Sequence, residues 1–376
     1  MKNKRFTPLI LLIILLTSVM LISSGCSSTK GEETKQNSVT QNSASEHNAT
    51  QPKTLVLGEM WEIESIDTAD GDGGTLICEK AAVTETLVGA NSDFSLKPGL
   101  AASWKQIDDN TWEFKLRNDV TFHDGTKMTA KEVKSSLENT IAKDSRVASM
   151  LKASSIDIID DYTFRIKTTE LNPIVPGILH YPTTAIISPS SFDKDGKYIK
   201  PVGTGPYKFD SFDEPKRVLT VVKNDNWWGG KVGLDKMIIK GIPDPNTRAM
   251  SIENGEVDFT ADVPYSETDR INSIDGITVE KYKTPRDYKL EINLKHSPLD
   301  DVRVRQAMSY AIDRQDIAEH VLYNVGEAAA GPFLPTMVWS NKSLKPYTRD
   351  LKKAGELLTA AGWVDTDGDG IREKDG

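Results

Sequence analysis

The stretch TWEFKLRNDVTFHDGTKMTAKEV, residues 111–133, decides the fold class of this chain. Trp112, Phe114 and Leu116 alternate with charged residues, which is the period of a strand with one buried face. A polar turn at 123–125 follows. Thr129 then precedes Glu132 by three residues, the pattern of a helix N-terminus with a reciprocal cap. The segment therefore predicts a strand that leads through a tight turn into a helix.

Further elements of both kinds flank this segment. Period-2 alternation or short apolar runs predict strands at 53–61, 162–169, 216–225 and 288–295. Apolar spacing of three and four predicts helices at 75–88, 246–252, 302–317 and 352–363, and the glycine-rich run 67–74 is expected to be a loop. Helices and strands interleave without an internal repeat. The fold class is therefore predicted as α/β (mixed α+β), in at least two lobes.

Composition and charge exclude some classes of function. The chain has 376 residues, enough for more than one core, and a formal net charge of −9. An acidic protein repels polyanions, so no nucleic-acid partner is expected. The five histidines lack the spacing of a metal site, and no nucleophile or phosphate-loop motif occurs, so we predict no catalytic residue, no metal ligand and no cofactor. The acid pairs Glu62/Glu64 and Asp160/Asp161 keep an enzyme, such as a peptide hydrolase, as an alternative.

The first 26 residues have the pattern of a signal peptide. A basic start leads to an apolar run at 8–22, shorter than the ~20 residues of a spanning helix, and then to small residues before Cys26. This ending resembles the lipobox of prokaryotic lipoproteins, although Ser23 stands where Leu is usual, and it predicts lipidation of Cys26. Ordinary secretion and an uncleaved anchor are the alternatives. The polar residues 27–52 are predicted to form a flexible linker.

The last residues contain a calcium-like pattern. Asp365, Asp367 and Asp369 alternate before a glycine, as in an EF-hand loop, but position 12 of that loop would be Gly376 instead of a bidentate Glu. Glu373 and Asp375 leave a weak ion site as an alternative. A polar turn is favoured.

Several of these stretches together resemble one family. Ala102-Ser103-Trp104 and the opening stretch resemble the signature of the peptide/nickel solute-binding proteins of ABC importers. The sequences PVGTGPYKF (201–209), VKNDNWWGGK (222–231), IPDPNTRAMSIENGEVDF (242–259), LDDVRVRQAMSYAIDRQDI (299–317) and KKAGELLTAAGW (352–363), followed by DTDGDGIREKDG, support the resemblance. These stretches occur in order over nearly everything after residue 52.

The resemblance implies a bilobal periplasmic-binding-protein-like fold of the large three-part type (Ia, Ib and II). Residues 53–285 would form the first lobe, with part Ib at about 82–198, and 286–376 would begin the second lobe after a hinge near 285–288. Relatives continue beyond the residue that matches Gly376, so we expect a fragment with an incomplete second lobe. The implied function is capture of a small peptide or a nickel or other metal chelate by lobe closure, and delivery to an ABC permease from the outer face of the cytoplasmic membrane. A surface sensing lipoprotein is the alternative.

The resemblance also suggests residues that face the ligand. Asp72 and Leu76 follow the first strand, Tyr181 and Thr183 lie in the segment HYPTTAI, and Tyr288 lies near the hinge. Arg146 matches an arginine near the cleft of nickel-binding relatives, where a guanidinium can hold a carboxylate. HYPTTAI lacks the arginine that nickel-chelate binders carry there, which weighs against a nickel chelate. For His123, Trp227 and Trp228, structural roles are favoured over ligand contact.

Overall fold

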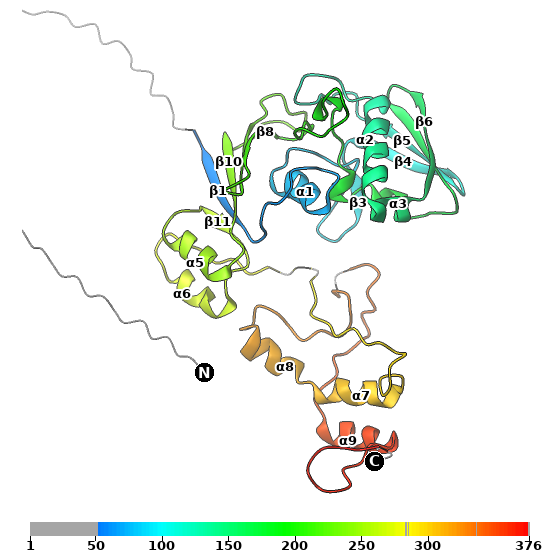
Figure 1. The fold of residues 1–376 in the computed structure, drawn as a ribbon, viewed down its shortest axis with the longest axis vertical. Coiled ribbons are helices and arrows are strands. Elements are labelled where there is room, and N and C mark those ends of the chain that lie inside the picture. The colour runs from blue at the N-terminus through cyan, green and yellow to red at the C-terminus, as the bar shows by residue number, and fades with distance from the viewer. Residues whose placement is uncertain (1–51, 283, 285, 336, 375–376) are drawn as a thin grey trace, which may run out of the picture. The chain divides into compact units, whose positions relative to one another are not determined.

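The computed structural model describes residues 52–282, 284, 286–335 and 337–374 (Figure 1). Both helices and strands are present, which confirms the predicted mixed α/β class. The predicted signal peptide, Cys26 and nearly all of the predicted linker lie outside the described residues. Among the residues that are described, no helix has the length and apolar character needed to cross a membrane.

A five-stranded sheet has the order β11-β1-β10-β9-β8. Its strands are β1 (Thr54–Glu59), β8 (Tyr207–Asp213), β9 (Val218–Lys223), β10 (Lys236–Gly241) and β11 (Phe259–Thr260). Strand β1 runs parallel to β10 and β11, whereas β10, β9 and β8 pair antiparallel. Leu219, Val221 and Ile239 are fully buried in its core. The strands predicted at 53–61 and 216–225 are confirmed.

A second, antiparallel sheet has the order β4-β5-β7-β6 and contains the alternating residues 111–116 as β5. Its strands are β4 (Ala101–Asp108), β5 (Thr111–Leu116), β6 (Ala153–Asp160) and β7 (Thr163–Thr168). On one face Phe114 and Phe164 stack with their ring centroids 5.2 Å apart, in the core that the helices α2 (Ala130–Lys143) and α3 (Ser145–Leu151) also enter (Figure 1). On the other face the Glu113 carboxylate lies 3.2 Å from Lys105 Nζ and 2.7 Å from Arg165 Nη2.

The junction from β5 to α2 is built from local signals. Gly125 has φ +87°, a conformation that glycine adopts without a steric penalty. The Thr129 hydroxyl accepts a hydrogen bond from the backbone N–H of Lys131, and the Glu132 carboxylate accepts one from the backbone N–H of Thr129 at 3.1 Å. This reciprocal cap confirms the helix start predicted at Thr129.

The other elements are short. They are β2 (Val88–Ala90), β3 (Leu96–Pro98), α1 (Gly71–Thr75), α4 (Val175–Ile178), α5 (Pro245–Glu253), α6 (Thr268–Asn272), α7 (Val302–Ala311), α8 (Arg314–Asp316) and α9 (Leu351–Ala360), with single turns of 3-10 helix at Pro182–Thr184, Pro189–Ser191 and Tyr265–Glu267 and of π-helix at Leu76–Lys80 and Ile317–Val321. The helices predicted at 246–252 and 352–363 are confirmed as α5 and α9.

Three element predictions are wrong in part or whole. The helix predicted at 75–88 begins earlier, inside the predicted loop, and ends at Lys80, shortly before Ala82, whose φ of +49° turns the chain away. The helix predicted at 302–317 breaks at Ile312, which is extended, because Asp313 caps a new helix. Residues 288–295 form no strand: no described strand pairs with them, and Tyr288, Leu290 and Leu294 are exposed.

Two chain segments connect the cores of the two sheets. Val83 belongs to the core of the five-stranded sheet and Leu87 to that of the four-stranded sheet, and the return passage runs from Val202 to Tyr207. The segments lie in backbone contact, since the Gly205 N–H donates to Val83 O at 3.0 Å.

His123 Nε2 lies 3.0 Å from Gly205 O, and burial lowers the pKa of His123 to about 4. This bonding agrees with the structural role expected for His123.

Candidate functional site

A concavity of 340 Å³ brings together charged side chains from two distant parts of the chain. Asp67 and Asp70 come from the loop before α1 and Gly71 is its first residue, and Lys143, Asp144 and Arg146 come from the corner between α2 and α3. The volume is at the small end of the range of ligand sites, about 300–1,000 Å³. We call this feature the charged concavity.

Asp144 organises one side of the charged concavity. Its Oδ1 accepts hydrogen bonds from the backbone N–H groups of Arg146 and Val147 at 2.9 and 3.3 Å, which caps α3. Its Oδ2 accepts one from the Thr183 hydroxyl at 3.0 Å. Burial opposes ionisation of Asp144, but these hydrogen bonds outweigh it and lower its pKa. The carboxylate is therefore a fixed anion beside Arg146.

Arg146 extends from this anchor into solvent. Its Nε lies 3.4 Å from Asp144 Oδ1, its side chain is 58% exposed, and its guanidinium carbon lies 5.7 Å from the ring centre of Tyr181. The Nη2 atom lies 2.5 Å from where a Cβ would stand on Gly71, so the guanidinium lies directly over the first residue of α1. The arrangement presents a cation next to an aromatic ring, which suits a carboxylate-bearing ligand.

The structure gathers four of the six predicted ligand residues, namely Asp72, Arg146, Tyr181 and Thr183. Tyr181 and Thr183 border Arg146 and Asp144, and the charge of Asp72 acts on Arg146. Thr183 and Leu76 are buried, Leu76 within the core of the five-stranded sheet, so neither side chain has much exposed surface. Tyr288 does not line the charged concavity, and it is 82% exposed.

Four charged residues that line the charged concavity were not predicted from the sequence: Asp67, Asp70, Lys143 and Asp144. Asp144 carried a usable signal, because an aspartate directly before an apolar helical repeat is a common N-cap. Asp67, Asp70 and Lys143 carried no such signal in the sequence. Their importance comes from meeting Arg146 across the fold.

Two aromatic candidates have structural partners. The indole N–H groups of Trp227 and Trp228 donate to the Glu85 carboxylate at 3.3 and 2.9 Å, and the Thr204 hydroxyl donates at 2.7 Å. Burial raises the pKa of Glu85 against the effect of these bonds. His180 Nδ1 similarly lies 3.2 Å from Val88 O. These contacts give the polar groups of Trp227, Trp228 and His180 protein partners, so no ligand is needed to explain their positions.

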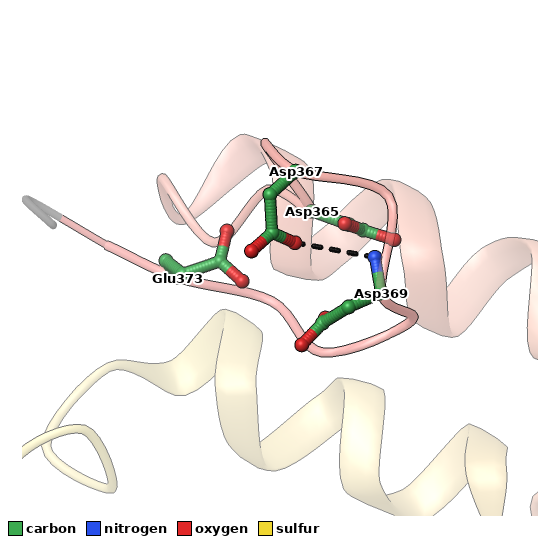
Figure 2. Close-up of side chains that lie close together, drawn as sticks. All are labelled: Asp365, Asp367, Asp369 and Glu373. Carbon is green, nitrogen blue, oxygen red and sulfur yellow. Dashed lines mark hydrogen bonds between the residues drawn. The ribbon is translucent and has the colours of Figure 1, made fainter.

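The acidic loop after α9 closes on itself. Carboxylate oxygens of Asp365, Asp367, Asp369 and Glu373 lie within 4.8 Å of one another (Figure 2). Asp365 accepts from the backbone N–H groups of Gly368 and Gly370, Asp367 accepts from that of Asp369, and Glu373 accepts from that of Thr366. These bonds form the polar turn favoured by the sequence. We assign no metal ion to it.

A depression of 580 Å³ also lies over α9, between Leu351 and Arg372. The Arg372 Nη1 group is occupied there, because it donates to Thr359 Oγ1 at 2.9 Å and to Trp363 O at 2.8 Å. This surface offers no group arranged around a ligand, and the charged concavity is the stronger candidate.

Comparisons with known proteins agree with the fold. Among curated proteins, the chain is similar to the glutathione-binding protein GsiB of Escherichia coli strain K12, with 31% identity over 287 residues, 74% of this chain and 55% of that protein. The chain thus spans about half the length of this curated relative.

Two solved structures give the same result. A nickel ABC transporter from Bacillus halodurans is 32% identical, with a TM-score of 0.72 over 86% of this chain and 66% of that one. The binding protein DppA from Helicobacter pylori, in complex with the peptide STSA, is 28% identical, with a TM-score of 0.69 over 82% of this chain and 66% of that one. The model of bacterial extracellular solute-binding proteins, family 5 Middle, matches residues 95–375. The chain therefore belongs to the family 5 bacterial extracellular solute-binding proteins.

Proposed function

We propose that this protein is the solute-binding component of an ABC importer, which captures a small peptide, glutathione or a metal chelate and delivers it to a membrane permease. The relatives named above are a glutathione-binding protein, a nickel ABC transporter protein and a binding protein in complex with a peptide. Glutathione and peptides both carry carboxylate groups. The observation that carries the proposal is the exposed guanidinium of Arg146 beside Tyr181 in the charged concavity.

The proposal includes two lobes and an anchor. Residues 53–285 would form the first lobe, with part Ib at about 82–198, and the second lobe would begin at 286 after a hinge near Tyr288. Closure of the lobes would bury the charged concavity, which strengthens its ion pairs by excluding water. Residues 1–26 would direct export and leave a lipid on Cys26, and residues 27–52 would tether the globular part to the outer face of the cytoplasmic membrane.

Ligand binding is tested on the purified protein with three probes: glutathione, trialanine and nickel with histidine. Calorimetric titration gives the affinity, and native mass spectrometry identifies any solute retained from the cell. We expect at least one probe to bind, and Arg146→Ala to weaken that binding about tenfold or more. Arg349→Ala, which removes another exposed arginine, is the control and should change nothing. Failure of all three probes, with no retained solute, would contradict the proposal.

The anchor is tested separately in cells. Wild-type protein should fractionate with membranes and incorporate labelled fatty acid, and Cys26→Ala should do neither. Equal membrane association of the two forms would rule out lipidation at Cys26.

A further inference from the structure

The segment 224–230, which we call the tryptophan strap, leaves the core of the five-stranded sheet and returns to it. Val221 precedes the strap and Val232 follows it, and both pack in that core. Between them, Trp228 packs against the core of the four-stranded sheet, and the guanidinium carbon of Arg117 lies 4.2 Å from the centre of its ring. The strap is therefore a third connection between the two cores, beside the two chain passages described above.

The half-buried carboxylate of Glu85 holds the strap at the point where the chain passes from one core to the other. Its Oε1 accepts a hydrogen bond from the indole N–H of Trp227 at 3.3 Å, and its Oε2 accepts one from the indole N–H of Trp228 at 2.9 Å. Oε2 also accepts from the hydroxyl of Thr204, on the return passage, at 2.7 Å. One carboxylate thus joins both chain passages to the strap.

Only a carboxylate suits these donors at position 85. An indole N–H can donate but cannot accept, so each of the two side-chain oxygens must accept from one tryptophan. A carboxamide of the same shape would place its NH2 group against either Trp227 or Trp228. One indole N–H would then lose its acceptor and meet a second donor, which is costly away from water.

The two walls of the charged concavity are anchored in the two cores that the strap joins. Asp67 precedes α1, and the chain then enters the core of the five-stranded sheet with Ile77. Arg146 lies on α3, which enters the core of the four-stranded sheet with Val147. A shift of one core relative to the other would therefore change the distance between the walls.

We propose that Glu85 is a positioning residue for solute binding: it docks Trp228 in the core of the four-stranded sheet and so fixes the two walls of the charged concavity relative to each other. The proposal rests on the solute-binding function above. Glu85 does not line the concavity, so it acts through the strap and contributes no contact with the solute.

The test measures the affinity of the whole purified chain for glutathione, trialanine and nickel with histidine by calorimetric titration. Glu85→Gln should weaken every probe that the wild type binds by about fivefold or more. Adding Trp228→Phe to Glu85→Gln removes one indole N–H, so the amide can accept from Trp227 and donate to the Thr204 hydroxyl. This double variant should regain affinity to within about twofold of the wild type. Glu214→Gln, on the exposed turn between β8 and β9, is the matched control and should change nothing.

A second variant, Trp228→Leu, tests the strap without changing either chain passage. It removes the ring that lies beside Arg117 and should weaken binding about as much as Glu85→Gln. Circular dichroism shows whether each variant is folded at the temperature of the titration, and Trp228→Leu decides the question if Glu85→Gln is not.

The outcomes separate this inference from the general function. A purely structural role would lower the melting temperature of Glu85→Gln and leave its affinity unchanged. Unchanged affinity in folded Glu85→Gln or in Trp228→Leu, or a double variant no tighter than Glu85→Gln, would overturn the positioning role and leave solute capture intact. If the wild type binds no probe, solute capture itself fails, and the positioning role fails with it.

Discussion

The contact between the two segments that join the sheets makes a sharp prediction for Gly205→Ala. A Cβ on residue 205 would lie 2.2 Å from Ala82 O and 2.9 Å from Val83 O, whereas carbon and oxygen atoms need about 3.5 Å. The segments must therefore separate by about 1 Å. That movement stretches the bond from the Gly205 N–H to Val83 O, now 3.0 Å, and the two bonds that Gly205 O accepts from His123 and Asn224, each also 3.0 Å.

The expected loss follows from these contacts. Three weakened hydrogen bonds at about 1 kcal/mol each, with strain of about 1 kcal/mol or more, give a loss of about 4 kcal/mol in the free energy of unfolding. For a chain of this size the melting temperature should fall by about 6 °C or more. Thermal unfolding followed by circular dichroism measures this shift.

Gly177→Ala is the matched control. It makes the same chemical change in α4, where an added Cβ meets no atom within 4 Å, and it should alter stability by less than about 1 kcal/mol. Gly203→Ala, whose Cβ would lie 2.1 Å from Val83 O, should reproduce the loss. Equal melting temperatures for Gly205→Ala and Gly177→Ala would refute the reasoning that backbone contact holds the two sheets together.

Three other perturbations test separate parts of the fold. Phe114→Ala removes a fully buried ring and should lower the free energy of unfolding by about 3–5 kcal/mol, a loss that Phe114→Leu should largely avoid; denaturant titration measures both. Thr129→Ala removes the cap of α2 and should lower the free energy of unfolding by about 1 kcal/mol, measured by the same titration. Thr129→Ser keeps the capping hydroxyl, so a similar loss in that variant would contradict a capping role. Burial lowers the pKa of His123 from 6.5 to about 4, so the folded state disfavours the protonated ring. The contribution of His123 to the free energy of unfolding should be complete above pH 6.5 and should fall by about 3 kcal/mol as the pH drops to 4. His123→Gln should lack this component, and an unchanged pH profile in that variant would disprove the assignment.

Local elements of the fold were predictable from the sequence. The alternation in 111–116, the glycine turn and the cap at Thr129 each depend on residues within a few positions, so the pattern contains all the interacting groups. The family could also be identified, because several such stretches occur in a fixed order. The strand expected at 288–295 illustrates the limit: alternation shows which residues suit a strand, but a strand forms only where another lies beside it.

The candidate site was only partly predictable. The sequence by itself determined that Arg146 and the segment with Tyr181 and Thr183 are candidates, and that a polar turn follows α9. Only the tertiary structure decided that Asp67, Asp70 and Arg146 line one concavity, because Arg146 is far from the other two in sequence and the fold brings them together. Charge pairing depends on distances of a few ångströms in space. Sequence spacing does not encode such distances between remote segments, and the fold alone sets them.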